Sequence, residues 1–145
     1  MITKIGDTTL EWHGEKIKKE SNSQIAKAML QIGLLVQASA TYRAPVDLGN
    51  LKNSIQIEAE AREVTIGTNV EYAPYLEFGT GIYAEKGDGR KTPWMYFNRK
   101  LNTYLWTRGN KPQPFLRPAL DENIERIKTL IINALNSAFR QGGGK

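Results

Sequence analysis

The stretch Tyr-Ala-Pro-Tyr-Leu-Glu-Phe-Gly-Thr-Gly, from Tyr72 to Gly81, decides how the rest of the chain is arranged. A proline and two glycines interrupt helices and strands alike, so the stretch predicts a bend. Pro74 suits the first turn of a short helix, and Gly79 suits the position that ends it. The apolar residues of this turn would be Tyr75, Leu76 and Phe78. A corner that only seals the core is an equal alternative.

A long helix is predicted before this bend. From about Glu15 to Tyr42, apolar residues recur every three or four positions, which places one apolar stripe along a helix. Gly33, inside it, costs about 1 kcal/mol relative to alanine. It either lets another element approach closely or is simply tolerated. The chain should then reverse at 47–50, where Asp47-Leu48-Gly49-Asn50 has the chemistry of a turn.

Further strands are predicted on both sides of the bend. Residues 54–60 and 63–68 alternate and predict a hairpin whose apolar side chains face the helices, namely Ile55, Ile57, Val64 and Ile66. Residues 94–97 and 103–107 predict a second hairpin. Thr8 to Trp12 predicts a short edge strand, with Leu10 and Trp12 on one side. A second amphipathic helix is predicted from Leu116 to about Arg140, with Pro118 in its first turn and Gly142 beyond its end.

These elements predict an α+β fold. An antiparallel sheet of about four strands would pack against the two long amphipathic helices, and a basic and aromatic hairpin would protrude. We expect a single domain over residues 1–145. Within it, 1–14 form an N-terminal arm or edge strand, 82–111 form an inserted loop and hairpin, and 142–145 form a flexible tail.

Charge is unevenly distributed along the chain. The whole chain has a net charge of +5, but residues 44–81 carry −4 and residues 82–145 carry +7. Such asymmetry predicts complementary surfaces, or a basic face for nucleic acid.

Enzymatic chemistry is not indicated by the motifs. The chain has no cysteine and one histidine, His13, so neither a nucleophile–histidine pair nor a zinc site is predicted. Gly79 to Ala84 matches a dinucleotide-binding pattern formally, but it does not lead from a parallel strand into a helix. The carboxylates of Glu58 and Glu60 lie on an open strand, where we expect them to be solvated or to face a partner. We therefore expect no cofactor and no metal.

No membrane span is expected either. The longest uncharged run, from Ala28 to Tyr42, is shorter than the roughly 20 apolar residues that cross a bilayer.

Two further motifs complete a pattern. Ala44 to Ile55 reads Ala-Pro-Val-Asp-Leu-Gly-Asn-Leu-Lys-Asn-Ser-Ile, and Pro112 to Leu120 reads Pro-Gln-Pro-Phe-Leu-Arg-Pro-Ala-Leu. With Tyr72 to Gly81 between them, the chain from about Glu15 to Arg140 resembles the tail-completion, or head–tail joining, proteins of tailed bacteriophages. The resemblance does not extend to the first dozen residues or to the glycine tail.

The resemblance implies a structural virion protein without catalysis. Such a protein caps the tail tube and joins it to the head-side connector or stopper protein, as a hexameric ring in the tail or neck, after assembly in the cytoplasm of the bacterial host. The ring would surround the DNA path, so non-specific DNA contact in its lumen is expected.

We expect acidic residues of one copy to meet the basic hairpin of the next, with aromatic anchors. The candidate interface residues are Glu58, Glu60, Glu63, Glu71, Tyr75, Phe78, Trp94, Tyr96, Arg99, Lys100, Trp106, Arg108 and Phe115. The alternative is a small basic nucleic-acid-binding protein, whose aromatics stack bases. A metal-dependent nuclease using Glu58 and Glu60 is a third, weaker interpretation.

Overall fold

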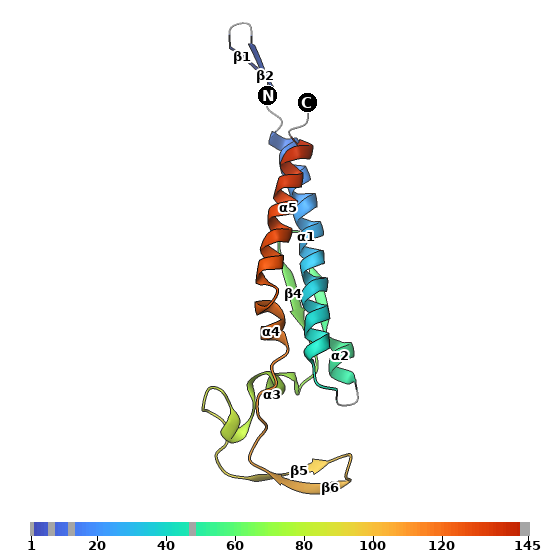
Figure 1. Ribbon diagram of the computed structural model, residues 1–145, viewed down its shortest axis with the longest axis vertical. Coiled ribbons are helices and arrows are strands. Elements are labelled where there is room, and N and C mark those ends of the chain that lie inside the picture. The colour runs from blue at the N-terminus through green and yellow to red at the C-terminus, as the bar shows by residue number, and fades with distance from the viewer. Residues whose placement is uncertain (1, 6–7, 12–13, 47–48, 143–145) are drawn as a thin grey trace. The chain divides into compact units, whose positions relative to one another are not determined.

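A computed structural model describes residues 2–5, 8–11, 14–46 and 49–142 (Figure 1). The chain groups into two compact units by contacts between Cα atoms. Unit 1 contains Met1–Leu35, Ile57–Ile66 and Asn123–Lys145, and unit 2 contains Val36–Gln56 and Gly67–Glu122. The prediction of a single domain stays a prediction, and the two units are described separately below.

The long N-terminal helix is confirmed as α1, Gly14–Arg43, which contributes its first part to unit 1 and its last part to unit 2. In unit 1 it packs against α5, Ile124–Gly142. The Gln24 side-chain amide donates to Gln141 Oε1 at 3.2 Å, so the two helices run antiparallel (Figure 1). Small and branched residues are buried in this unit, namely Ala28, Ile32, Ala134 and Ala138.

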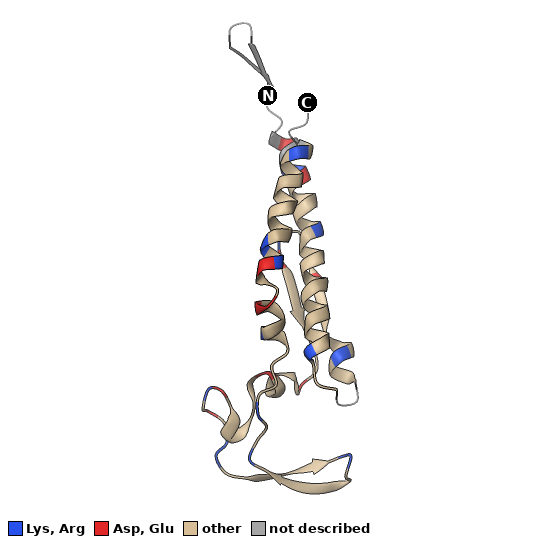
Figure 2. Cartoon of the chain, in the orientation of Figure 1, with Lys and Arg blue, Asp and Glu red and all other residues tan. Residues whose placement is uncertain are grey.

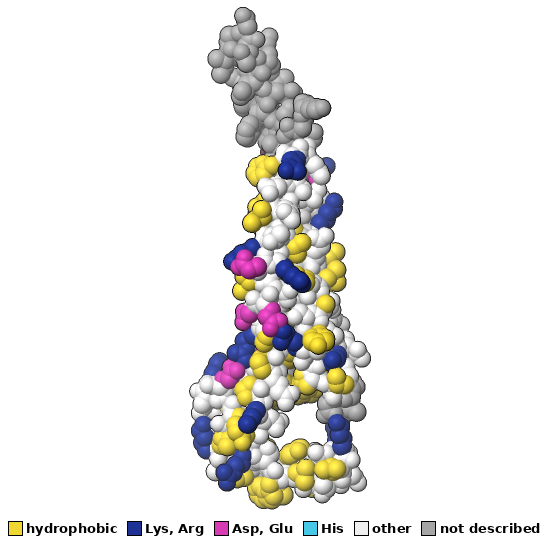
Figure 3. Space-filling model, in the orientation of Figure 1, with side chains coloured by type: hydrophobic (Ala, Val, Ile, Leu, Met, Phe, Trp, Pro, Cys, Tyr) yellow, Lys and Arg dark blue, Asp and Glu magenta, His cyan; other side chains and the backbone are white. Residues whose placement is uncertain are grey.

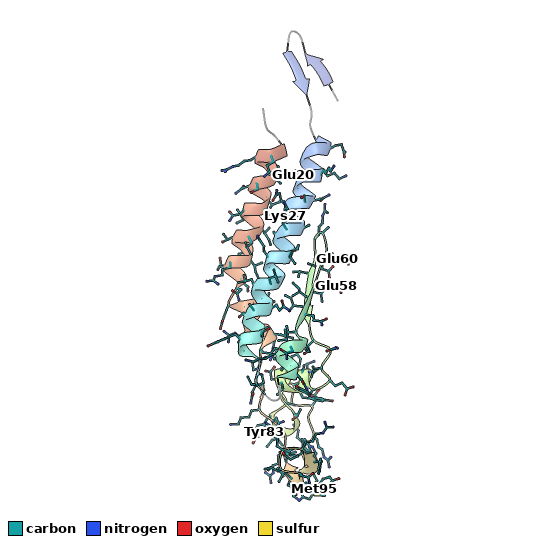
Figure 4. All side chains as sticks on the ribbon, turned by 90° about the vertical axis from the view of Figure 1, so that its right-hand side faces the viewer. Glu20, Lys27, Glu58, Glu60, Tyr83 and Met95 are labelled. Atoms are coloured by element: carbon teal, nitrogen blue, oxygen red, sulfur yellow. The ribbon has the colours of Figure 1, made fainter. Side chains whose placement is uncertain are left out.

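Strands β3, Gln56–Ala59, and β4, Val64–Gly67, form a two-stranded sheet on the other side of α1 (Figure 4). A Cβ on Gly33 would lie 2.8 Å from Val64 Cγ2 and 3.2 Å from Ile57 Cδ1. Gly33 therefore permits close approach of the sheet, as one of the two sequence interpretations proposed. The contact also confirms that Ile57 and Val64 face the helix.

The N-terminal strand is confirmed as β2, Thr8–Glu11, and it pairs with β1, Ile2–Ile5, which sequence did not predict. Trp12 and His13 lie outside the described residues, so the expected pairing of Leu10 with Trp12 on one side stays a prediction.

Unit 2 contains the bend, the inserted hairpin and α2, Asn50–Ser54, a short helix that sequence reasoning missed. Gly49 precedes α2 with a φ of 74°, which glycine adopts readily. Asp47 and Leu48, the first half of the predicted turn, lie outside the described residues. The largest fully buried side chains in this unit are Leu51 and Phe115.

The prediction of one sheet of about four strands is wrong. The described strands form three separate two-stranded sheets, β1–β2, β3–β4 and β5–β6. Alternation in the sequence specifies which residues share a face, but it does not specify which strands pair. The α+β class and the two long helices are confirmed.

The C-terminal helix is broken, contrary to the single helix predicted. Helix α4, Leu116–Asp121, ends before Glu122, and α5 begins at Ile124. Asn123 between them is buried and its carbonyl accepts the Ile127 N–H at 2.9 Å, the first bond of α5. Asparagine is favoured at this N-cap position, which explains a new start here.

Candidate functional site

The bend at Tyr72 to Gly81 folds as predicted, into one short helix that stops at a glycine. Helix α3, Ala73–Phe78, has Pro74 in its first turn, and Gly79 follows with a φ of 73°. Ala73 and Glu77 are buried, whereas Tyr75 and Phe78 are 60% and 42% exposed. The bend thus seals the core on one side and presents aromatic side chains on the other.

A buried carboxylate, Glu77, holds this bend to the start of α4. Glu77 is only 4% exposed. The backbone N–H groups of Phe115, Leu116 and Arg117 donate to its two oxygens at 2.8, 3.1 and 3.0 Å. These are N–H groups that the first turn of α4 leaves without helical partners, so Glu77 stabilises that helix end from a distant part of the sequence.

The Arg117 side chain extends the same network. Its Nε donates to Glu77 Oε1 at 3.0 Å, and one terminal nitrogen donates to the Glu77 backbone oxygen at 2.8 Å. The two terminal nitrogens of the guanidinium also donate to the two carboxylate oxygens of Glu85, at 2.9 and 2.8 Å. The guanidinium lies 4.9 Å from the centre of the Phe78 ring. One arginine therefore joins α3, α4 and the start of the inserted loop.

The network shifts the pKa values of its carboxyl groups. Burial alone would raise the pKa of Glu77, but the N–H groups of residues 115–117 and the Arg117 side chain outweigh it, and the pKa lies below the usual 4.5. The hydrogen bonds from Arg117 lower the pKa of Glu85. The two carboxylates in turn raise the pKa of Arg117. All three groups are charged at neutral pH, which suits a structural ion network rather than proton transfer.

Glycines let two backbone segments cross at the base of the inserted loop. The amides of Thr80 and Ile82 donate to the carbonyls of Asn110 and Arg108 at 2.9 and 3.0 Å. A Cβ on Gly81 would lie 2.0 Å from the Arg108 oxygen, and one on Gly109 would lie 2.0 Å from the Thr80 oxygen. Only glycine fits these two positions, so residues 79–82 and 108–113 form a tight base. We call this base, together with the Glu77–Arg117 network, the corner.

The inserted loop leaves the corner as η1, Gly81–Tyr83, and continues into the predicted hairpin of β5, Trp94–Asn98, and β6, Thr103–Thr107. In its register Met95 pairs with Trp106 and Phe97 with Tyr104. Paired residues of an antiparallel ladder share a face, so these four side chains form one apolar face. Their exposed fractions are 55%, 69%, 45% and 66% in that order of pairs, and Figure 3 shows hydrophobic side chains gathered over the hairpin.

The opposite face carries Trp94 and Tyr96, paired with Thr107 and Leu105. The three predicted anchors are therefore divided, with Trp94 and Tyr96 on one face and Trp106 on the other. No acidic residue occurs between Gly89 and Lys111, and this stretch has six basic ones (Figure 2). They include the predicted Arg99, Lys100 and Arg108, all exposed.

The predicted acidic residues are also exposed. Glu58, Glu60 and Glu63 belong to unit 1 and Glu71 to unit 2. Figure 4 shows Glu58 and Glu60 on the side of the strands away from α1. Phe115, by contrast, is fully buried. Its role is in the core of unit 2, and it offers no surface to a partner.

Sequence reasoning missed the residues that build the corner and three of the four residues of the hairpin's apolar face. Glu77 and Arg117 lie within the quoted motifs, but nothing in the sequence says that residues 40 positions apart are bonded. Met95, Phe97 and Tyr104 were detectable, because alternation from Trp106 and a two-stranded register would place them together.

A cavity of about 750 Å³ lies beside the corner and is lined by aromatic residues, Tyr72, Tyr75 and Trp94, together with Asp88 and Arg90. Arg90 lies 5.6 Å from the centre of the Trp94 ring. The lining residues hold one carboxylate and no histidine, so they do not form an acid–base pair.

Among residues 2–5, 8–11, 14–46 and 49–142, no cluster of three or more metal-ligating side chains occurs. In the same part of the chain, no helix is both long enough and apolar enough to cross a membrane.

The fold defines the class of protein as an α+β chain, and its hairpin exposes an apolar face. A sequence model of the family described as "Bacteriophage HK97-gp10, putative tail-component" matches residues 7–79, and the chain belongs to this family. It is thus a structural protein of bacteriophage, a tail component that works in the virion beside other phage proteins. No curated protein and no solved structure matches the chain.

The family match begins at residue 7, nearer the N-terminus than the resemblance predicted, and it ends at Gly79. It therefore includes β2, α1, α2, β3, β4 and α3. The hairpin, the third motif at Pro112 to Leu120 and α5 lie beyond it.

Proposed function

We propose that this chain completes the end of a phage tail and joins it to the head-side connector or stopper protein, as a hexameric ring without catalysis. The observation that carries the proposal is the β5–β6 hairpin of a tail-component chain, which is basic, lacks acidic residues and exposes an apolar face. A tail protein with such an arm is equipped to contact a neighbour.

A closed ring needs a heterologous interface, in which one surface of a subunit meets a different surface of the next. The chain has two unlike surfaces of this kind. Glu58, Glu60 and Glu63 are exposed on and beside one sheet, and Arg99, Lys100 and Arg108 are exposed at the hairpin. Opposite charges guide association and fix its register, so we assign these groups to opposite sides of one subunit contact.

The same ring would contact the tail tube on one side and the connector on the other, and it would surround the DNA path. Basic residues at the lumen would then touch phosphates without reading sequence, and such contacts weaken steeply with salt. Tyr75 and Phe78, exposed on α3 beside the corner, are further candidate contacts. This arrangement places the protein in the neck of the virion.

Charge reversal tests the ring. In the variant Arg99→Glu, Lys100→Glu, Arg108→Glu, we expect a folded chain that no longer forms rings and no longer completes tails, as measured by sedimentation and by electron microscopy of assembled tails. The matched control is Lys18→Glu, Lys19→Glu, Lys27→Glu, which makes the same change in net charge at exposed positions of α1. Rings that form equally well in both variants would exclude the hairpin as the arm.

A small nucleic-acid-binding protein is the second candidate, favoured by the six basic residues interleaved with exposed Phe97, Tyr104 and Trp106. Aromatic side chains stack bases while basic residues follow the backbone. A mobility-shift assay at low and moderate salt separates the two functions. Binding that resists salt and selects a sequence would favour this second function, whereas weak binding that salt abolishes fits lumen contact alone.

A further inference from the structure

The β5–β6 hairpin leaves a large apolar surface uncovered. Its apolar hairpin face consists of Met95, Phe97, Tyr104 and Trp106, each between 45% and 69% exposed. The Phe97 and Tyr104 rings pack edge to face at 5.2 Å. An isolated two-stranded hairpin is marginally stable in water, and a contiguous apolar patch of this kind marks an interaction site. The face therefore needs a cover.

Unit 1 contains a narrow sheet whose edges are open. The sheet of unit 1 that packs on α1 contains only β3 and β4, so each of these strands has an outer edge that pairs with no other strand of the described chain. Such edges accept an added strand through backbone hydrogen bonds. The sheet packs on α1 at Gly33, through Val64 and Ile57.

Helix α1 carries further apolar residues next to the position where this sheet packs. At about 100° per residue, Leu30 and Leu34 lie about 60° and 100° around the helix from Gly33, in the same direction. Two buried residues of α1, Ala28 and Ile32, lie on the other side of the helix. Leu30 and Leu34 are 48% and 51% exposed. They form an apolar strip of α1 next to the edge of a sheet that is too narrow to cover it.

We propose that the β5–β6 hairpin of one copy adds to the edge of the β3–β4 sheet of a second copy, and that its apolar hairpin face covers Leu30 and Leu34 there. The two strands of the hairpin and the two strands of β3–β4 would then form one four-stranded sheet between two chains. The inner face of β3–β4 is apolar and faces α1, so the apolar hairpin face continues it in the added strands. This inference rests on the proposed function only in taking a second copy as the partner.

Charge supports a second copy as the occupant. Glu58, Glu60 and Glu63 are exposed, and they lie on and beside the strands whose edges are open. The hairpin carries Arg99, Lys100 and Arg108 and no acidic residue. Nucleic acid could also contact the basic residues, but it would leave Leu30 and Leu34 exposed.

Cysteine cross-linking tests the pairing directly, because the chain has no cysteine of its own. Chains carrying Thr103→Cys on β6 are mixed with chains carrying either Glu58→Cys on β3 or Thr65→Cys on β4. We expect disulfide-linked dimers of the two variants with one of these sheet positions. Thr129→Cys, at an exposed position of α5, is the control that should give only background. Cross-linking no greater than this background at both sheet positions overturns the inference.

A substitution series tests the face. Tyr104→Ser, on the apolar hairpin face, should weaken self-association about 30-fold, the loss expected of an aromatic hot spot. Tyr96→Ser, on the opposite face, should weaken it less. Tyr42→Ser, at an exposed position of α1, is the matched control without effect. An equal or larger loss for Tyr96→Ser overturns the assignment, as does a Tyr104→Ser variant that loses DNA binding but associates normally.

The two proposals fail in different ways. Rings seen by electron microscopy without hairpin-to-sheet cross-links would retain the proposed function and overturn this inference. Cross-linked dimers that close on themselves, without rings, would support this inference and contradict the ring.

Discussion

The corner and the β5–β6 hairpin are neighbours in unit 2, and they are built in opposite ways. In the corner, the buried carboxylate of Glu77 accepts hydrogen bonds from three backbone N–H groups. Gly81 and Gly109 allow two backbone segments to come into contact there. In the hairpin, four large apolar side chains are about half exposed or more. The polar groups of the corner are paired within the chain, whereas the apolar side chains of the hairpin remain exposed. A rigid base and an unsatisfied arm together suit a protein that assembles.

The largest loss of stability is expected from substitution of a glycine in the corner. Gly81→Ala should destabilise the corner by about 3 kcal/mol or more, because a positive φ is costly for alanine and its Cβ would overlap the Arg108 carbonyl. Native-state hydrogen exchange at the amides of Thr80 and Ile82 measures the loss. Gly87→Ala is the matched control, since Gly87 has a φ of 70° with no atom within 4 Å of a Cβ. It should cost only about 1 kcal/mol, and equal losses would mean that the backbone crossing contributes nothing.

A smaller effect is expected at the buried carboxylate. Glu77→Gln keeps the shape but removes the charge from the bonds to residues 115–117, so it should cost about 2–3 kcal/mol at neutral pH. Faster exchange of the Phe115, Leu116 and Arg117 amides measures this cost. Glu85→Gln, which removes an exposed partner of Arg117, should change those amides much less, because exposed ion pairs contribute little.

The same variant has a distinct pH dependence. The pKa of Glu77 is lower in the folded chain than its usual 4.5, so its contribution to stability is complete above the usual pKa and is lost as the pH falls through the lowered value. The corner of the unchanged protein should therefore weaken in acid, and Glu77→Gln should remove that part of the slope. An identical acid slope in the variant would show that other carboxyl groups cause it.

The sequence was sufficient to predict the helices and strands that depend on neighbouring residues alone. Pro74 and Gly79 predict the short helix of the bend because their effects are confined to their own backbone, and alternation predicts β5 and β6 to within a residue. Periodicity likewise predicts the full length of α1.

The remaining features, which are the corner contacts, the burial of Phe115 and the pairing of strands, depend on contacts between residues distant in the sequence. The role of Glu77 depends on where Phe115 to Arg117 lie in space, and the need for glycine at Gly81 depends on the passage of residue 108 past it. Phe115 resembles an interface aromatic in the sequence because only its burial distinguishes it from Phe97. Strand pairing was wrong for the same reason, because alternation carries no information about partners.

The smallest effect is expected in the turn of the hairpin, and it shows whether the two regions are separable. Asn102 has a φ of 46°, a left-handed conformation that asparagine tolerates better than alanine. Asn102→Ala should destabilise the hairpin by about 1 kcal/mol, visible as faster exchange of the amides of β5 and β6. Asn102→Gly, which removes the steric cost, is the matched control and should leave the turn intact. The amides of Thr80 and Ile82 should not respond to either change, because they donate to the carbonyls of Asn110 and Arg108, which lie outside β5 and β6. If they open together with β5 and β6, the arm and its base form one cooperative structure, and the hairpin cannot rearrange on a partner without loosening the corner.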